Sequence, residues 1–187
     1  MKIDFINLER MFIANNELII TPDIWIISDT HFFHENIGRY CNRPENWQDL
    51  IINNWNNLIA PDEQVLHLGD FALGKKMNFE LLTGSLNGKL FLIRGNHDRL
   101  SKTYCEAHAV TLLNEPLHVD YYDRVKLVFS HRPIIPLPDD LINLHGHIHN
   151  VPPPPEGSNL GPRHLNMSVE VREYRPWRLQ DIIKHLI

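Results

Sequence analysis

Five short apolar runs in this chain end directly in polar side chains, and this repeated junction constrains the fold more than any other feature. The clearest case is the run at residues 89–93, which leads through Arg94 into the motif at 95–98. Apolar runs of this length that are closed by Gly or by polar residues are typical of buried strands. Sites in α/β sheets gather beyond the carboxyl ends of the strands, so we expect these polar residues to converge. The residues at the five junctions are Asp29, His31, Asp70, Asn96, His97, Asp98, His131, His147 and His149.

The remaining pattern predicts helices between strands in the first half of the chain and more strands in the second. The other four apolar runs lie at 24–27, 65–68, 126–129 and 141–144. Helices are expected at 47–59, 78–86, 101–109 and 179–187, with a shorter one between 32 and 46. Further strands are expected at 165–171, in a hairpin of 117–122 with 125–129, and in an added hairpin of 5–6 with 18–20. Asn78 is expected to cap its helix. This order favours a mixed sheet, or two packed sheets, flanked by helices, in one domain over residues 1–187.

The composition excludes several classes of protein. Lys and Arg number 18 against 23 Asp and Glu, and a net charge of -5 argues against a general binder of nucleic acid or membrane surfaces. No stretch approaches the roughly 20 apolar residues of a membrane span, and the N-terminus lacks the apolar core of a signal peptide. Cys41 and Cys105 do not form a disulfide framework, so free thiols in a reducing compartment are expected. We therefore expect a cytoplasmic protein; the sequence leaves its oligomeric state open.

The donor types at the junctions suit a pair of divalent metal ions. Two carboxylates, several imidazoles and an amide oxygen, without a thiolate, form a nitrogen and oxygen site. Manganese is the expected occupant, with Fe, Ni, Co and Zn as alternatives, whereas Ca and Mg prefer oxygen ligands alone. Two such ions beside Asp29 and Asp70 would leave a net charge of roughly +2, which attracts a phosphate group. His97 is the candidate acid that protonates the leaving oxygen, and Asp98 is the candidate to orient His97 or to stabilise its charge.

The order and spacing of these motifs resemble the calcineurin-like metallophosphoesterases, in particular their small bacterial and phage members. The resemblance runs from Ile24 to Val171, and single pieces such as Gly-Asp carry little weight beside the full ordered set. The matching motifs are Asp-Thr-His-Phe-x-His at 29–34, Gly-Asp-Phe at 69–71, Arg-Gly-Asn-His-Asp at 94–98, His131, Gly-His-x-His at 146–149 and Asn-x-Ser-Val-Glu at 166–170. Two departures are Ser130, where many members have glycine, and Asp98, where many have glutamate.

The resemblance implies a role for each matching position. Asp29, His31 and His149 would bind the first metal, and Asp70 would bridge both metals. Asn96, His131 and His147 would bind the second metal, while His97 would be the catalytic acid. The resemblance also implies the family's α/β/β/α sandwich, in which two packed mixed β-sheets are flanked by helices. Contacts to substrate are expected from Asn96, His34 and Arg132.

The leading functional hypothesis is a phosphoesterase in which a hydroxide that bridges two divalent metals attacks the ester. A small phosphate ester is the expected substrate, and a phosphodiester, including one of a nucleotide, is slightly favoured over the alternative of a phosphomonoester. The absence of an evident basic stripe counts against an autonomous nuclease on long strands. A different class, a non-catalytic metal-binding scaffold on the same fold, is disfavoured by the complete set of ligands together with His97.

Overall fold

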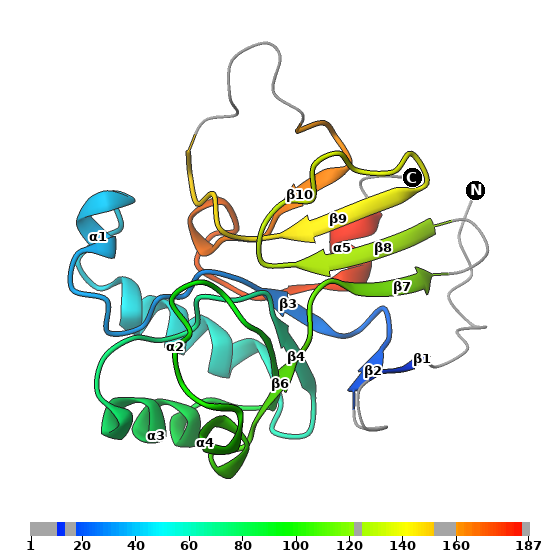
Figure 1. Cartoon of the computed structure of the whole chain (residues 1–187). Helices are drawn as coiled ribbons and strands as arrows, with labels where there is room; N and C mark the ends of the chain where they lie inside the picture. Colours follow the sequence, from blue (N-terminus) through cyan, green and yellow to red (C-terminus); the bar gives the residue numbers. More distant parts are fainter. Residues whose placement is uncertain (1–10, 14–17, 122–124, 152–159, 185–187) are drawn as a thin grey trace.

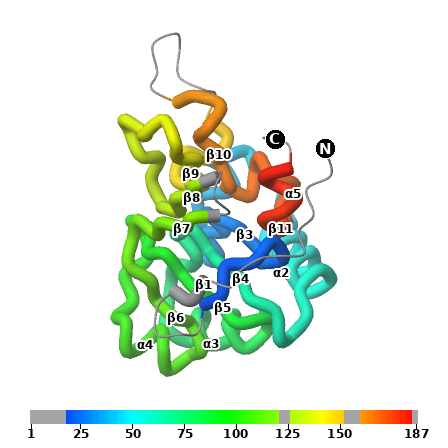
Figure 2. The backbone as a smooth tube through the Cα atoms, turned by 90° about the vertical axis from the view of Figure 1, so that its right-hand side faces the viewer, coloured from blue at the N-terminus to red at the C-terminus, as the bar shows by residue number. Residues whose placement is uncertain are grey.

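The computed structural model describes residues 11–13, 18–121, 125–151 and 160–184, and it contains two main β-sheets. The larger sheet has the strand order β11-β3-β4-β5-β6, in which β3 to β6 run parallel and β11 is antiparallel to β3. The smaller sheet has the order β10-β9-β8-β7, in which only β7 is antiparallel to its neighbour. Both sheets are mixed, as predicted, and they lie one above the other in Figures 1 and 2.

The strands and helices have the following bounds. In the larger sheet, the strands are β3 (Trp25–Ile27), β4 (Gln64–His67), β5 (Lys89–Ile93), β6 (Val110–Leu113) and β11 (Trp177–Arg178). In the smaller sheet, they are β7 (Leu117–Tyr121), β8 (Val125–Ser130), β9 (Leu141–His145) and β10 (His164–Asn166). The helices are α1 (Ile37–Tyr40), α2 (Trp47–Leu58), α3 (Lys76–Ser85), α4 (Lys102–Ala107) and α5 (Leu179–Ile183). A separate antiparallel pair joins β1 (Met11–Ile13) to β2 (Leu18–Ile20).

The larger sheet is buried on both faces, which explains why its strands are continuous apolar runs. Successive side chains of a strand point to opposite faces. On one face, Ile26 joins the core between the sheets, where it clusters with Phe129 of β8. On the other face, Ile27 joins a second core that contains Trp55 of α2 and Phe79 of α3. Helices therefore cover the outer face of this sheet, and the fold is the expected two-sheet sandwich flanked by helices (Figure 1).

Two predictions about local structure were wrong. The run at 165–171 was expected to be a strand, but pairing with β9 ends at Asn166 and a 3₁₀ turn follows at Val169–Val171. The run turns away because Ser168 and Val169 instead meet Ser28, at the end of β3. Asn78 lies inside α3 and does not cap it, since the helix begins after Lys75, whose side chain makes no capping hydrogen bond.

Other expected segments extend into residues that the structure does not describe. The helix expected at 179–187 is present as α5, and residues 185–187 lie outside the described part. The turn of the expected hairpin, at 122–124, also lies outside the described residues. So do residues 5–6, which were expected to pair with residues 18–20. None of the helices in the described residues is long and apolar enough to cross a membrane.

Candidate metal centre

The loops that follow β3 and β4 run side by side, and this pairing brings the first junction residues together. The backbone N–H of Asp29 donates to the carbonyl of Gly69 (3.0 Å), and that of His31 donates to the carbonyl of Asp70 (2.9 Å). The pairing continues beyond the strands to a bridge between Phe32 and Ala72. The two loops are thus joined by backbone hydrogen bonds, which fixes where their side chains point.

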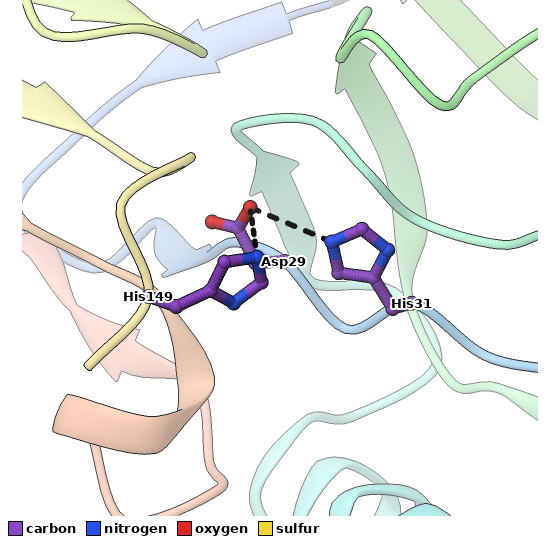
Figure 3. Close-up of side chains that lie close together, drawn as sticks. All are labelled: Asp29, His31 and His149. Atoms are coloured by element: carbon purple, nitrogen blue, oxygen red, sulfur yellow. Dashed lines mark ion pairs between the residues drawn. The ribbon is translucent and has the colours of Figure 1, made fainter. Parts of the chain in front are cut away.

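Asp29, His31 and His149 form the first group of donors. One donor atom from each lies within 4.8 Å of the other two. The carboxylate Oδ1 of Asp29 is 3.9 Å from Nε2 of His31 and 3.9 Å from Nε2 of His149, and Figure 3 shows both rings directed at it. Both ring nitrogens of His31 are buried without a hydrogen-bond partner among the described residues. Buried polar atoms are rarely left unpaired, so a cation fits this group.

Asp70, His131 and His147 form the second group, whose donor atoms also lie within 4.8 Å of one another. Oδ2 of Asp70 is 3.4 Å from Nε2 of His131 and 3.4 Å from Nε2 of His31, so it lies between the two groups. Oδ1 of Asn96 is 3.0 Å from Nε2 of His131. Nδ1 of His131 contacts the carbonyl oxygen of Leu68 (3.0 Å), which can only accept a hydrogen bond. Nδ1 therefore carries the proton, which leaves Nε2 free to bind a metal in the neutral ring.

Each of the two aspartates is held by hydrogen bonds from the protein and presents one oxygen to the centre, although Oδ1 of Asp29 also lies 3.1 Å from the backbone N–H of His147. Oδ2 of Asp29 accepts hydrogen bonds from the hydroxyl of Ser168 (2.9 Å) and the backbone N–H of His147 (2.9 Å). Oδ1 of Asp70 accepts from the backbone N–H of His97 (2.8 Å). These bonds fix the carboxylates, because rotation of either one would break them.

A buried ion pair supports the first group from behind. Nδ1 of His149 lies 3.0 Å from Oε1 of Glu170, and the same oxygen accepts hydrogen bonds from Nε (2.9 Å) and Nη2 (2.6 Å) of Arg43. Arg43 also donates to the carbonyls of Asp29 (2.7 Å) and Thr30 (2.8 Å). The two charged side chains are 1% exposed or less. A carboxylate on the second nitrogen of a ligating histidine orients the ring and raises its basicity.

The sequence analysis did not identify Arg43, Glu170 or Ser168 as part of the centre. The available signal was the motif at 166–170, which was noted only as part of the resemblance. The structure gives this motif a role in supporting the centre. The side-chain amide of Asn166 donates to the backbone carbonyl of His149 (2.6 Å), and its oxygen accepts from the hydroxyl of Ser168 (2.7 Å).

Five of the seven expected ligands have a positive φ. The values lie between 50° and 72°, in the left-handed region that residues other than glycine seldom adopt. The five residues are Asp29, His31, Asp70, His147 and His149. Such strain persists only where the surrounding structure imposes it, and it clusters at functional sites.

Two glycines are required by close approach to these ligands. A side chain at Gly95 would clash with the backbone and carboxylate of Asp70. A side chain at Gly146 would clash with the carboxylate of Asp29 and the hydroxyl of Ser28. The glycines in the motifs at 94–98 and 146–149 therefore make room for the aspartates of the neighbouring loops.

Burial and neighbouring charges set the protonation of the donors. Burial lowers the pKa of His31 to about 2, so this ring is neutral, which is the form that binds metal. Burial, followed by the charge of Arg132, lowers the pKa of His147 to about 4. Burial would also lower the pKa of His149, but its contacts with Cys41 and Glu170 outweigh it and raise the value to about 10. Metal binding at His149 would therefore release a proton.

The pKa values of the two aspartates are shifted in opposite directions. Burial raises the pKa of Asp29 above its usual value. Burial acts in the same sense on Asp70, but the neighbouring His131 outweighs it and holds the pKa of that carboxyl below its usual range.

Of the two expected catalytic residues, His97 lies beside the first group. The ring centroid of His97 is 5.1 Å from that of His31 and 5.8 Å from that of His34. The carboxylate of Asp98 differs from expectation, since it accepts hydrogen bonds from the backbone N–H groups of Asp70 (2.7 Å), Gly95 (2.8 Å) and Phe71 (2.9 Å). Its contacts among the described residues thus support the Asp70 loop and do not orient the ring of His97.

The chain is similar to one family model and to several known proteins. A model of the calcineurin-like phosphoesterase family matches residues 22–183. An uncharacterized protein of Methanocaldococcus jannaschii is 37% identical over 172 residues, which cover 86% of this chain and 89% of the other. A solved structure of a protein of unknown function from Aquifex aeolicus has a TM-score of 0.67 at 24% identity, over 88% of this chain and 98% of that one. A nuclease from Pseudomonas putida has a TM-score of 0.44 at 22% identity, over 70% and 64%.

The family match covers most of the chain, including the expected ligands, and the fold of the Aquifex protein is shared over nearly its whole length. The chain belongs to the calcineurin-like phosphoesterase family.

Proposed function

We propose that this chain is a dinuclear metal-dependent phosphoesterase. The observation that carries the proposal is the position of Asp70, whose Oδ2 lies 3.4 Å from a histidine of each donor group. One carboxylate oxygen between two sets of donors is the arrangement that two adjacent ions require. The family supports hydrolysis of phosphate esters as the reaction.

The chain's own residues would hold and serve the two ions in distinct ways. Asp29, His31 and His149 would hold the first ion, Asn96, His131 and His147 would hold the second, and Asp70 would bridge them. Two divalent ions at this spacing supply positive charge for the phosphoryl oxygens and lower the pKa of the attacking water. Manganese is our proposed occupant, because the nitrogen and oxygen donors suit it.

His97 would protonate the leaving oxygen. Its backbone is tied to Asp70, and its ring lies at the edge of the first group, next to His34. A positioned acid of this kind contributes about 10²-fold to 10⁴-fold to the rate. We favour phosphodiesters over phosphomonoesters, because an open pocket adjoins the second group and leaves room for the second ester arm.

The decisive variant is Asp70→Asn. It preserves the size of the side chain but removes the shared negative charge, so turnover of bis(p-nitrophenyl) phosphate with Mn²⁺ is expected to fall by about 10³-fold or more. Bound manganese, measured by elemental analysis after gel filtration, is expected to fall with it. Full activity in a folded Asp70→Asn protein would refute the proposal.

His97→Asn is the matched variant, since it should keep both metals and lose rate only. Turnover of p-nitrophenyl phosphate against the diester, at equal enzyme and metal, decides between monoesterase and diesterase.

A further inference from the structure

A pocket of about 570 Å³ opens beside the second metal group. Its walls come from the segments after β5, β6 and β8, so it lies where the two sheets meet. Its polar lining is Arg94, Asn96, Asn114, Glu115, His131 and Arg132. The volume is in the range of small-molecule sites. Since Asn96 and His131 are also candidate metal ligands, a group in this pocket would be next to the reacting ester.

The charges of the lining favour an anion. Arg94 is fixed to the wall, because its Nη1 donates to the carbonyls of Asp98 (2.7 Å) and Leu100 (2.9 Å). Arg132 is exposed, and its backbone carbonyl accepts from the hydroxyl of Ser130 (2.6 Å), while its guanidinium makes no hydrogen bond or ion pair with any described residue. Its charge is nevertheless close enough to the second group to lower the pKa of His147. Against these two cations stands the carboxylate of Glu115, which accepts from the backbone N–H of His131 (2.7 Å).

The pocket therefore has a positive excess in a chain whose net charge is -5. An arginine without a protein partner offers a planar pair of donors that matches a phosphate. The amides of Asn96 and Asn114 offer both donors and acceptors, which suit the hydroxyl groups of a sugar or the edge of a base.

We propose that this pocket binds a second phosphate of the substrate, so that the preferred substrates are nucleotide phosphodiesters with a neighbouring phosphate. The inference rests on the proposed phosphoesterase function and names its substrate class. Arg132 would be the residue that confers the preference, because its guanidinium lines the pocket and has no partner among the described residues.

The test compares three dinucleotides: TpT, the same molecule with a 5′-phosphate, and the same molecule with a 3′-phosphate. One of the phosphorylated forms is expected to be cleaved with a kcat/KM about tenfold above that of TpT, the magnitude of one charge-assisted contact. Arg132→Gln should remove this preference, so that the kcat/KM of the phosphorylated forms relative to that of TpT falls to about one. Higher salt should weaken the preference of the parent protein, since the guanidinium is exposed.

Two further variants test whether the preference depends on the charge inside the pocket. Arg99→Gln removes an exposed arginine of the 94–98 loop region that does not line the pocket, so it should keep the preference. Glu115→Gln removes the opposing carboxylate while keeping an oxygen that can accept from His131, so it should increase the preference. Arg94→Gln is avoided, because it would release the backbone carbonyls of Asp98 and Leu100, which follow His97.

Equal kcat/KM for the three dinucleotides, or a preference that survives Arg132→Gln, would overturn the inference. Hydrolysis of bis(p-nitrophenyl) phosphate without cleavage of any dinucleotide would also overturn it, yet would leave the proposed function standing. Loss of activity on all these esters would instead count against the proposed function.

Discussion

Glu170 and Glu115 each support one half of the metal centre, but they do so in different surroundings. Glu170 is buried with Arg43 and contacts the ring of His149. Glu115 is exposed, and within the described part of the chain its carboxylate accepts a single hydrogen bond, from the backbone N–H of His131. The first half is thus built into the protein interior by an ion pair, whereas the second half opens onto a pocket. Under the proposed function, the first half would mainly hold a metal and the second would also meet the substrate.

Metal stoichiometry should show the largest contrast between the halves. In the first group, Glu170 orients the ring of His149 before metal arrives, so this group is expected to bind the tighter of two Mn²⁺ ions. His149→Ala should remove the tighter equivalent, and His147→Ala should remove the weaker one and leave the tighter. Isothermal titration with Mn²⁺ measures both. Identical titrations for the two variants would break the comparison.

Glu170→Gln should have the next largest effect. It leaves Arg43 buried without its charge partner, which costs about 3 kcal/mol of stability in proteins. The midpoint of urea unfolding of the metal-free protein should therefore fall. The affinity of the tighter Mn²⁺ ion should fall by about 10-fold to 100-fold, because the ring of His149 loses its orienting carboxylate. An unchanged affinity in the folded variant would show that Glu170 serves stability alone.

Glu115→Gln is the matched change in the second half, and its effect on stability should be small. The amide oxygen can still accept from His131, and no buried charge is left unpaired. We expect a loss of less than about 1 kcal/mol in urea unfolding, with both metals retained. A loss as large as that of Glu170→Gln would mean that the two halves are supported alike.

The convergence of the candidate ligands was largely predictable, because many of them follow strands directly. Asp29, Asp70 and Asn96 each come one to three residues after a buried apolar run, so the strand positions fix them within a short distance. The same local logic failed for the helix start at Asn78, because the backbone of Lys75 already serves as the cap position. It also failed for Asp98, whose adjacency to His97 in sequence did not decide which donors its carboxylate would meet.

The residues that support the candidate ligands could not be predicted from the sequence, for a different reason. Arg43 and Glu170 are 127 residues apart in the chain, and neither follows an apolar run of the larger sheet. Their contact exists only because the segment after β10 leaves the smaller sheet and passes beside the end of β3. No periodicity or spacing records such a turn.

The sequence by itself determined the strands and the types of side chain that follow them. Apolar runs specify strands because burial of their side chains is local and repetitive, and the residue types after them specify a nitrogen and oxygen centre. Only the tertiary structure decided which oxygen of Asp70 faces both groups, why five ligands have a positive φ, and that a buried ion pair supports one half. These features depend on contacts between loops from both sheets, and such contacts arise only when the sheets pack.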